Sequence, residues 1–188
     1  MGLEALDVKA FYLINHLRAD WLGWFLGLCS EPKFIYLFFA LTGLLIAKRF
    51  GIKQFCLIYL FLFLGFLWVD FTVARILKPL FKRPRPFVSI GDVYLGGAHA
   101  KYLVTPLVKK VSYSFPSAHA SNVGFASFYL SLWYKKAAWL WLCFAFLVGW
   151  SRVYLGVHYP FDVLMGWCYG GLWALIIYNL SKKLVSRI

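Results

Sequence analysis

Long apolar runs separated by short polar connections fill the chain from residue 34 to residue 180. A helix needs about 20 mainly apolar residues to cross a bilayer, and four or five runs approach this length. They are Phe34–Ala47, Phe55–Leu77, Ala118–Trp133, Ala138–Val153 and Phe161–Leu180. Some runs are short, so their helices are expected to continue into the flanking polar residues. The pattern predicts an all-α, integral membrane helical bundle.

The first 31 residues follow a different pattern. Apolar residues recur at helical spacing from Leu3 to Leu17, with charged residues between them. The next apolar run, Trp21–Cys29, is too short to cross the hydrocarbon core. Residues 1–31 are therefore predicted to form helices that lie at the membrane interface or dip into it.

Composition agrees with a membrane protein. Of the 188 residues, 62% are hydrophobic and 14% are charged, whereas about a quarter of the residues in a globular domain are charged. The mean hydropathy is +0.71. No linker or repeat divides the chain, so one domain is expected over residues 1–188. The net charge of +13 favours anionic lipid over nucleic acid as a partner, because the basic residues sit beside apolar runs.

Basic residues collect in alternate connections and in the C-terminal tail. These residues are Lys48, Arg49, Lys53, Lys135, Lys136, Lys182, Lys183 and Arg187. No acidic residue accompanies them, so the positive-inside rule places this side in the cytoplasm. Residues 79–115 then form an outward loop that is also basic and is rich in glycine, proline and aromatic residues. We expect this loop to be irregular and to form a lid or a rim around a lipid headgroup.

Three short segments place polar chemistry at the outward ends of the apolar runs. In the first, Lys78 precedes Pro79, which is expected to stop the helix, and Arg85 lies between two prolines that restrict the backbone. A lysine that reaches towards the interface would explain Lys78 alone, but a fixed guanidinium suits phosphate oxygens. Lys82 and Arg83 are less constrained, and we assign them to electrostatic attraction of headgroups.

The second segment, Pro116-Ser117-Ala118-His119, opens the third apolar run. Free backbone N–H groups at a helix start form an anion site. Ser117 can cap this helix, bind a phosphate oxygen, or do both. His119 lies about one turn inside, where a structural histidine paired with Asn122 is the ordinary explanation. Its depth, which matches that of the other segments, favours a general acid.

In the third segment, Arg152 lies near the end of the fourth run, and His158 and Asp162 flank the start of the fifth. Four residues separate His158 from Asp162, so the carboxylate can accept one ring N–H and leave the other ring nitrogen as a nucleophile. Asp162 can instead only cap the helix. That alternative leaves Arg152 and His158 unexplained at a membrane boundary, where charged groups are costly.

Together the three segments resemble the signature motifs of the type 2 phosphatidic acid phosphatase superfamily. The matching patterns are Lys78-x6-Arg85-Pro86, Pro116-Ser117-Ala118-His119 and Ser151-Arg152-x5-His158-x3-Asp162. The resemblance spans residues 78–162 and implies a bundle of five to six spanning helices, with an N-terminal helix beside them. Ala118 is a departure, because the family usually has glycine there. We expect a helical φ at this position, which alanine allows.

The resemblance also implies a role for each matching residue. His158 would form a phosphohistidine, Asp162 would orient it, and His119 would protonate the leaving oxygen and later activate water. The phosphoryl oxygens would be bound by Lys78, Arg85, Ser117, Ala118 and Arg152. This chemistry needs no metal and no other cofactor.

The leading hypothesis is a lipid phosphatase at the outer face of a bacterial-type inner membrane. Similar small enzymes of this family act on undecaprenyl diphosphate, phosphatidylglycerol phosphate or the 1-phosphate of lipid A. Lys101, Lys109 and Lys110 favour lipid A or undecaprenyl diphosphate, because a large anionic headgroup would use these charges. The alternatives are a phosphotransferase that passes the group to another lipid, and a small transporter with its charges along a pathway. Vanadate haloperoxidases have this type of site but resemble soluble proteins.

A few polar residues lie outside the three segments. Asp70 is inside the second apolar run, about two turns before Lys78, and is expected either to pair with a buried donor or to support the site. His16 and His99 are interpreted as surface or loop residues without an identified partner. Four cysteines without metal-type spacing are interpreted as small core residues: Cys29, Cys56, Cys143 and Cys168.

Overall fold

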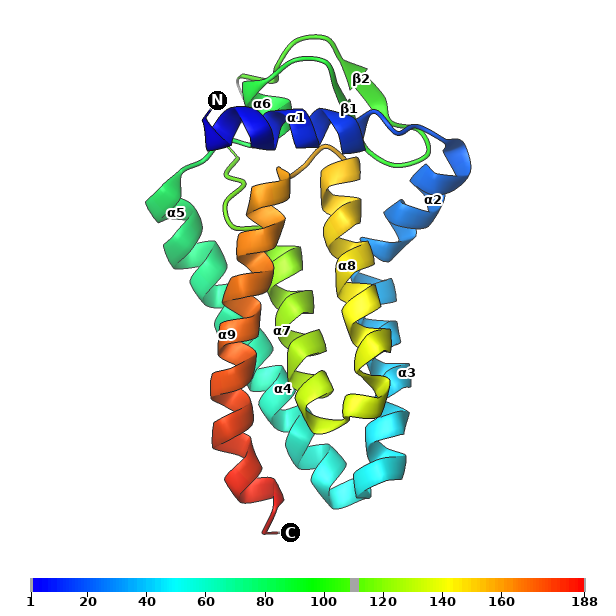
Figure 1. Cartoon of the computed structure of the whole chain (residues 1–188), viewed down its shortest axis with the longest axis vertical. Helices are drawn as coiled ribbons and strands as arrows, with labels where there is room; N and C mark the ends of the chain where they lie inside the picture. The colour runs from blue at the N-terminus through cyan, green and yellow to red at the C-terminus, as the bar shows by residue number, and fades with distance from the viewer. Residues whose placement is uncertain (1, 109–111, 188) are drawn as a thin grey trace.

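A computed structural model describes residues 2–108 and 112–187 of the chain. Long helices run side by side along the long axis, and a shorter helix lies across one end of them (Figure 1). The long helices are α3 (Pro32–Phe50), α4 (Ile52–Thr72), α7 (Ala118–Trp133), α8 (Ala138–Tyr154) and α9 (Pro160–Val185). Their bounds agree with the predicted runs to within about two turns, and the mainly helical fold is confirmed.

Length and apolar character identify fewer spans than expected. Among the described residues, three helical segments are long and apolar enough to cross a membrane: Ile52–Phe81, Lys135–Tyr154 and Pro160–Val185. A fourth results if α2 (Asp20–Cys29) and α3 are taken together, although the pair is bent by 64°. Helix α7 has 16 residues, fewer than the roughly 20 of a full span. The structure thus supports three or four spans on these criteria.

Helix α7 lies in the interior of the bundle. Residues 120–127 are all buried, and α7 packs most extensively on α9 and then on α8. Gly166 and Gly170 of α9 face the first turns of α7, where an added Cβ atom would collide with the backbones of Ser117 and Ser121. The missing side chains let the two backbones approach closely. This contact fixes the start of α7 against the start of α9.

Pro79 does not end the second long helix, contrary to the sequence-based expectation. Helix α4 continues through a π-helical turn, Val73–Leu77, into α5 (Lys78–Phe81). It stops where Lys82 adopts a left-handed conformation, with φ of 48°. Proline lacks an N–H and crowds the carbonyl one turn before it, and a π turn at that place relieves the crowding by widening the helix. Lys78 therefore lies one turn inside a longer helix.

The outward loop is more regular than predicted. It contains the short helix α6 (Pro86–Ser89) and an antiparallel hairpin of β1 (Val93–Leu95) and β2 (Lys101–Leu103). The rings of Tyr94 and Tyr102 lie side by side across the hairpin, with centroids 4.7 Å apart. Strands of three residues are too short to show an alternating pattern in the sequence. The all-α expectation holds for the bundle and misses this hairpin.

Helix α1 (Leu3–Asn15) crosses the end of the bundle next to the hairpin (Figure 1). The Asn15 amide donates to the carbonyls of Tyr94 and Tyr154, each at 2.9 Å, and its oxygen accepts the Tyr94 N–H at 2.9 Å. The Arg18 guanidinium donates to the same two carbonyls at 3.1 and 2.8 Å. These bonds join α1 to both the hairpin and the end of α8. His16 also has a partner that its sequence context did not identify, the Asp92 carbonyl at 2.8 Å.

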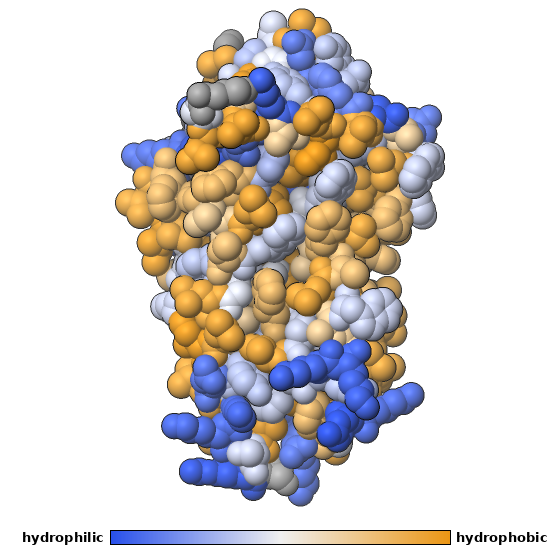
Figure 2. Space-filling view, viewed as in Figure 1, coloured by the Kyte–Doolittle hydropathy of each residue, from blue (hydrophilic) through white to orange (hydrophobic). Residues whose placement is uncertain are grey.

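The surface is divided into an apolar band and polar ends (Figure 2). The α3–α4 turn, the α7–α8 turn and the C-terminal end of α9 meet at the end opposite α1, and their lysines and arginines are exposed there. In the band between the ends, large side chains such as Leu37, Phe63 and Phe146 are more than half exposed. Apolar exposure of this extent suits contact with lipid.

Three of the four cysteines are not core residues. Cys29 is buried, but Cys56, Cys143 and Cys168 are exposed on α4, α8 and α9. An apolar run in a membrane helix does not distinguish the face that meets lipid from the face that meets protein. The expectation that all four are buried is wrong for this reason.

The Asn15 contacts predict a stability effect. Asn15→Ala removes three hydrogen bonds and takes the side-chain acceptor away from the Tyr94 N–H, while Arg18 still donates to the two carbonyls. It should lower the free energy of unfolding by about 1–3 kcal/mol. Chemical or thermal unfolding of the purified protein in detergent measures this change. Leu13→Ala on the same helix is the matched control, because Leu13 is 73% exposed. Equal stability of the two variants would contradict a stabilising role of the Asn15 hydrogen bonds.

Candidate active site

The three motif segments meet at the end of the bundle that α1 crosses. Lys78 comes from α5, Arg85 caps α6, His119 lies in the first turn of α7, and Arg152 lies in the last turn of α8. His158, in the turn between α8 and α9, is within electrostatic range of all four. Residues separated by up to 80 positions in the sequence therefore surround one buried imidazole.

The turn before α9 places His158 inside the protein. Gly156 adopts a φ of 77°, and the N–H of His158 donates to the Arg152 carbonyl at 3.3 Å. The side chain is only 1% exposed. Burial, followed by the positive charges of Arg85 and Arg152, lowers the pKa of His158 well below its ordinary value. The ring is therefore neutral near pH 7, as a nitrogen nucleophile has to be.

Asp162 faces His158 from the first turn of α9. The distance from His158 Nδ1 to Asp162 Oδ2 is 3.6 Å, longer than a hydrogen bond. Nδ1 is buried and has no hydrogen-bond partner among the described residues. Such contacts often tighten when a ligand binds. Asp162 also caps its helix, because the same oxygen accepts the Tyr159 N–H at 2.8 Å. Orientation of the histidine and capping are thus compatible roles of one carboxylate.

Arg83 is part of this site, contrary to its assignment to headgroup attraction. Its Nη1 donates to Asp162 Oδ1 at 2.8 Å, and its Nη2 donates to Asp7 Oδ2 at 2.6 Å. Burial by itself would lower the pKa of Arg83, but the two carboxylates outweigh burial and raise it above its ordinary value. The partners lie 76 and 79 residues away in sequence. No local pattern in the sequence identifies such a pairing.

Arg85 and Arg152 keep donors free inside the protein. Arg85 Nη1 donates to the Val157 carbonyl at 3.3 Å, and Arg152 Nη1 donates to the Ser30 hydroxyl. The Nε atom of each arginine is buried and has no hydrogen-bond partner within residues 2–108 and 112–187. A buried N–H with no acceptor is costly, and an oxyanion between the two arginines would supply acceptors for both. The geometry fits a phosphoryl group.

The start of α7 has the predicted form. The Ser117 hydroxyl accepts the Ala120 N–H at 3.4 Å and so caps the helix. Ala118 is helical, and the only described non-glycine residues with positive φ are Lys82 and Asp92. Alanine therefore fits where the family usually has glycine, as expected. Ser117 is fully buried, and its N–H donates to the Asp162 carbonyl at 3.0 Å, which ties the second motif to the third.

The partner of His119 differs from the one considered from the sequence, whereas Asp70 pairs with a buried donor, which was one of its two expected roles. The His119 ring is hydrogen-bonded to the backbone of Ser30, at the end of α2. Asn122 donates instead to Asp70 Oδ1, at 2.8 Å. Asp70 thereby gains the partner that its sequence context did not identify, and it lies within electrostatic range of Lys78. Ser30, which contacts both His119 and Arg152, is a site residue that carries no motif signal.

The site suits an anion rather than a cation. Within residues 2–108 and 112–187, no group of three or more His, Cys, Asp or Glu side chains is arranged to hold a metal ion. Lys78, Arg85 and Arg152 instead bring three cationic side chains around His158. Fixed cations of this kind can stabilise the charge on a phosphoryl group during its transfer.

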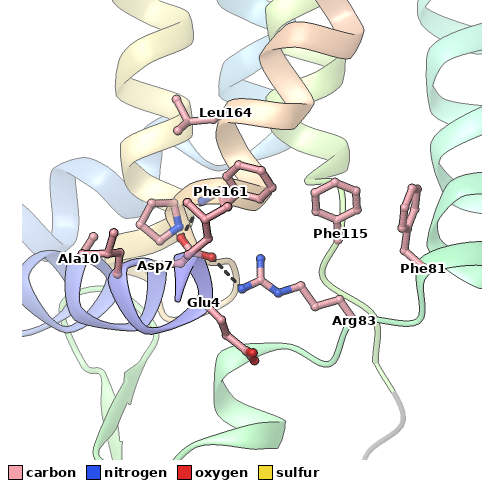
Figure 3. A pocket seen from close by; sticks show the side chains of 11 residues that line it. Glu4, Asp7, Ala10, Phe81, Arg83, Phe115, Phe161 and Leu164 are labelled. Atoms are coloured by element: carbon pink, nitrogen blue, oxygen red, sulfur yellow. Dashed lines mark hydrogen bonds and ion pairs between the residues drawn. The ribbon is translucent and has the colours of Figure 1, made fainter. Parts of the chain in front are cut away.

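An apolar groove opens beside the site, between α1, the end of α5 and the start of α9 (Figure 3). Its volume is about 600 Å³. Its walls are mostly apolar, and Asp7 and Arg83 are among the residues that line it. The full set comprises Leu3, Glu4, Leu6, Asp7, Ala10, Phe81, Arg83, Phe115, Pro160, Phe161 and Leu164. The groove thus brings apolar surface next to the ion pair that holds Asp162.

Curated proteins with related sequences cover most of the chain. An undecaprenyl-diphosphatase of Sulfolobus acidocaldarius is 30% identical over 175 residues, covering 87% of this chain and 73% of that protein. A lipid A 4'-phosphatase of Bacteroides thetaiotaomicron is 26% identical over 190 residues, covering 99% and 81%. A protein named bacitracin transport permease protein BcrC, of Bacillus licheniformis, is 29% identical over 184 residues, covering 98% and 85%.

Solved structures and a family model agree with this relationship. The crystal structure of Aquifex aeolicus LpxE matches with a TM-score of 0.65 and 25% identity, over 95% of this chain and 99% of that one. A transmembrane PAP2-type phosphatidylglycerolphosphate phosphatase from Bacillus subtilis has the same fold, with a TM-score of 0.65 at 24% identity, over 96% and 87%. The model of the PAP2 superfamily matches residues 54–186, which include all three motif segments. The chain therefore belongs to the PAP2 superfamily.

Proposed function

We propose that this protein is a membrane phosphatase that hydrolyses lipid phosphates or diphosphates through a phosphohistidine on His158. The observation that carries the proposal is the buried His158, whose Nδ1 lies 3.6 Å from Asp162 Oδ2 and which is within electrostatic range of Lys78, Arg85 and Arg152. The unpartnered Nε atoms of Arg85 and Arg152 support a phosphoryl group as the ligand. Relatives named as lipid phosphatases support the substrate class.

In the proposed reaction, Nε2 of His158 attacks phosphorus while the bond from phosphorus to the leaving oxygen breaks. His119 gives a proton to that oxygen. Asp162 accepts the Nδ1–H and stabilises the positive charge that develops on the ring. Water then attacks the phosphohistidine, its proton passes to His119, and the N–P bond breaks to release inorganic phosphate. Lys78, Arg85, Arg152 and the backbone at Ser117 and Ala118 hold the phosphoryl oxygens throughout.

We propose lipid A 1-phosphate or undecaprenyl diphosphate as the substrate, with phosphatidylglycerol phosphate as the third candidate. The apolar groove beside Arg83 suits a lipid with a bulky hydrocarbon part. Lys101 is exposed on the hairpin and would meet a large anionic headgroup. Lys109 and Lys110, which were expected to act with it, lie outside the described residues.

The site is proposed to face the outside of a bacterial-type inner membrane. The opposite end of the bundle carries the exposed lysines and arginines of two turns and the C-terminal end of α9. Basic turns remain on the cytoplasmic side of a membrane. The helix α1 and the hairpin would then lie at the outer interface, over the phosphate site.

The two alternative functions, a phosphotransferase and a transporter, differ in the role they require of His158. A phosphotransferase would form the same phosphohistidine but would release phosphate only to an acceptor lipid. One relative is named a transport permease, and a transporter would need charge along a pathway rather than a nucleophile. The contact of His158 with Asp162 and its complete burial favour chemistry at this residue.

The proposed roles predict loss of activity at two histidines. His158→Ala and His119→Ala should each lower the rate of phosphate release by about 10³-fold or more, because one removes the nucleophile and the other the acid–base group. The assay measures inorganic phosphate from purified protein with lipid A, undecaprenyl diphosphate, phosphatidylglycerol phosphate and phosphatidic acid in turn, with EDTA present. The control is His99→Ala, because His99 is exposed on the outward loop.

Robust turnover by both histidine variants would refute the assigned mechanism. Release that requires a second, acceptor lipid would favour the phosphotransferase. The transporter would be favoured if wild type released no phosphate from any lipid and if the His158→Ala variant still carried a flux of an ion or lipid.

The unpartnered arginine donors predict stabilisation by phosphate. Inorganic phosphate should raise the unfolding temperature relative to chloride at equal ionic strength, by the equivalent of about 2.7 kcal/mol at 100 times the dissociation constant. Arg152→Gln should remove most of this shift, because it removes one of the two guanidinium groups. Arg75→Ala should retain it, since Arg75 is exposed. An equal shift in wild type and Arg152→Gln would argue against the anion site.

The lowered pKa of His158 predicts a broad acid range of activity. A histidine nucleophile is active above its pKa and is lost as the pH falls through it, so the acid limb of kcat/KM should lie below the ordinary value of about 6.5. Burial, and after it the cations, lowers this pKa. Arg85→Gln removes one cation and should move the limb to higher pH, while titration of the substrate is the same for both proteins. An acid limb that Arg85→Gln leaves in place would contradict this electrostatic coupling.

A further inference from the structure

Arg83 holds two acidic side chains from different elements. Asp162 is fully buried and Asp7 is 8% exposed, while the Arg83 side chain is 23% exposed. Its Nη1 lies 2.8 Å from Oδ1 of Asp162, and its Nη2 lies 2.6 Å from Oδ2 of Asp7. The guanidinium also lies 4.2 Å from the ring centroid of Tyr159, the residue whose N–H binds the other oxygen of Asp162.

We propose that Arg83 is a positioning residue that fixes Asp162, and through it His158, with Asp7 of α1 as its second anchor. This inference rests on the proposed phosphohistidine chemistry. Arg83 binds Oδ1 of Asp162, so that Oδ2 remains directed to the Tyr159 N–H and the His158 ring. Contacts at both oxygens thus fix the rotation of the Asp162 carboxylate.

The backbone around Arg83 supports this role. The Arg83 carbonyl accepts the N–H of Ser114 at 2.8 Å, and Ser114 is fully buried three residues before the cap of α7. On the other side, Asp7 Oδ1 accepts the N–H of Phe161 at 2.8 Å, in the first turn of α9. Arg83 thus lies in a frame made of α1 and the starts of α7 and α9, as Figure 3 shows for Asp7 and Phe161.

Charge gives Arg83 a second effect on the nucleophile. A fully buried carboxylate without a counter-charge draws a proton or a cation towards itself. The positive charge of Arg83 neutralises Asp162, so the adjacent His158 can remain neutral. Without Arg83, the negative charge of Asp162 would stabilise the imidazolium form of His158 and remove the nucleophile.

Arginine is required here for its shape as well as its charge. A planar fork can direct separate N–H groups to two carboxylates at once, whereas a lysine ammonium is a compact charge on a flexible stem. Arg83→Lys should therefore keep the neutralising charge and lose the geometry. Arg83→Ala loses both, and Asp7→Asn keeps Arg83 but removes its second anchor.

The experiment compares these three variants with wild type and with Arg75→Ala, a substitution of an exposed arginine on the long helix that precedes Arg83. For each protein, kcat, KM and the pH profile of kcat/KM are measured on the lipid that wild type hydrolyses best. Folding is checked by gel filtration and circular dichroism in detergent. Wild type is measured first, and absence of phosphate release from every lipid by wild type would overturn the proposed function itself.

The positioning role predicts losses in kcat with KM changed less than about threefold. Partners in the second layer of a site typically contribute 10–100-fold, so we expect about 100-fold lower kcat for Arg83→Ala and about 10-fold for Asp7→Asn and Arg83→Lys. The acid limb should move to higher pH in Arg83→Ala and return towards the wild-type position in Arg83→Lys. Arg75→Ala should match wild type.

A purely structural role of Arg83 would lower kcat and the yield of folded protein together and leave the acid limb in place, and that result would overturn the proposal. A rise in KM at constant kcat would also overturn it, because it would make Arg83 a substrate-binding residue. If Arg83→Ala does not fold, the test rests on Arg83→Lys and Asp7→Asn. A wild-type kcat in both variants would overturn the proposal. A lowered kcat with unchanged KM would support it.

Discussion

One buried carboxylate organises the active end of this molecule. Asp162 is fully buried, and a carboxylate in that position is stable only if hydrogen bonds and an opposite charge compensate it. Arg83 supplies the charge, and the Tyr159 N–H supplies a further bond. The Asp162 carbonyl also accepts the Ser117 N–H. Compensation of this charge holds the loop after α5 against the start of α9, and the separate backbone bond from Ser117 adds the start of α7. Asp7 extends the network to α1.

The cations of the site are in the opposite condition. Asp162 is fully satisfied, whereas Arg85 and Arg152 each retain a buried Nε without an acceptor. Burial of like charges around His158 is unfavourable without an anion, and the same arrangement becomes favourable when a phosphoryl group enters. In the proposed reaction, the negative charge of the bound phosphoryl group would compensate these cations.

The sequence predicts the parts of this arrangement that depend on local pattern. Apolar runs predict the long helices, and the spacing of Ser117, His158 and Asp162 predicts a cap and a histidine–carboxylate contact. Arg83 and Ser30 escape prediction, because their partners are 76 to 122 residues away and neither residue has a distinctive neighbourhood. Pro79 misleads for a different reason: a π turn before it lets the helix continue, and the energy of such a turn depends on packing that the sequence pattern does not display.

The length of α7 determines how far the candidate active site lies below the membrane interface in the proposed orientation. Sixteen helical residues extend about 24 Å at 1.5 Å each, which is less than the roughly 30 Å of hydrocarbon in a bilayer. In the proposed orientation, with the exposed lysines of the α7–α8 turn at one interface, the first turn of α7 would lie below the level of the other interface. His119 and Ser117, at the start of α7, would therefore be recessed, and α1 and the hairpin lie beyond this end of the bundle (Figure 1). A lipid phosphate of the proposed kind would have to descend from the headgroup layer to reach His158, and the apolar groove beside Arg83 would offer its hydrocarbon part a surface at the same depth. A recessed site of this kind suits a substrate anchored in the membrane.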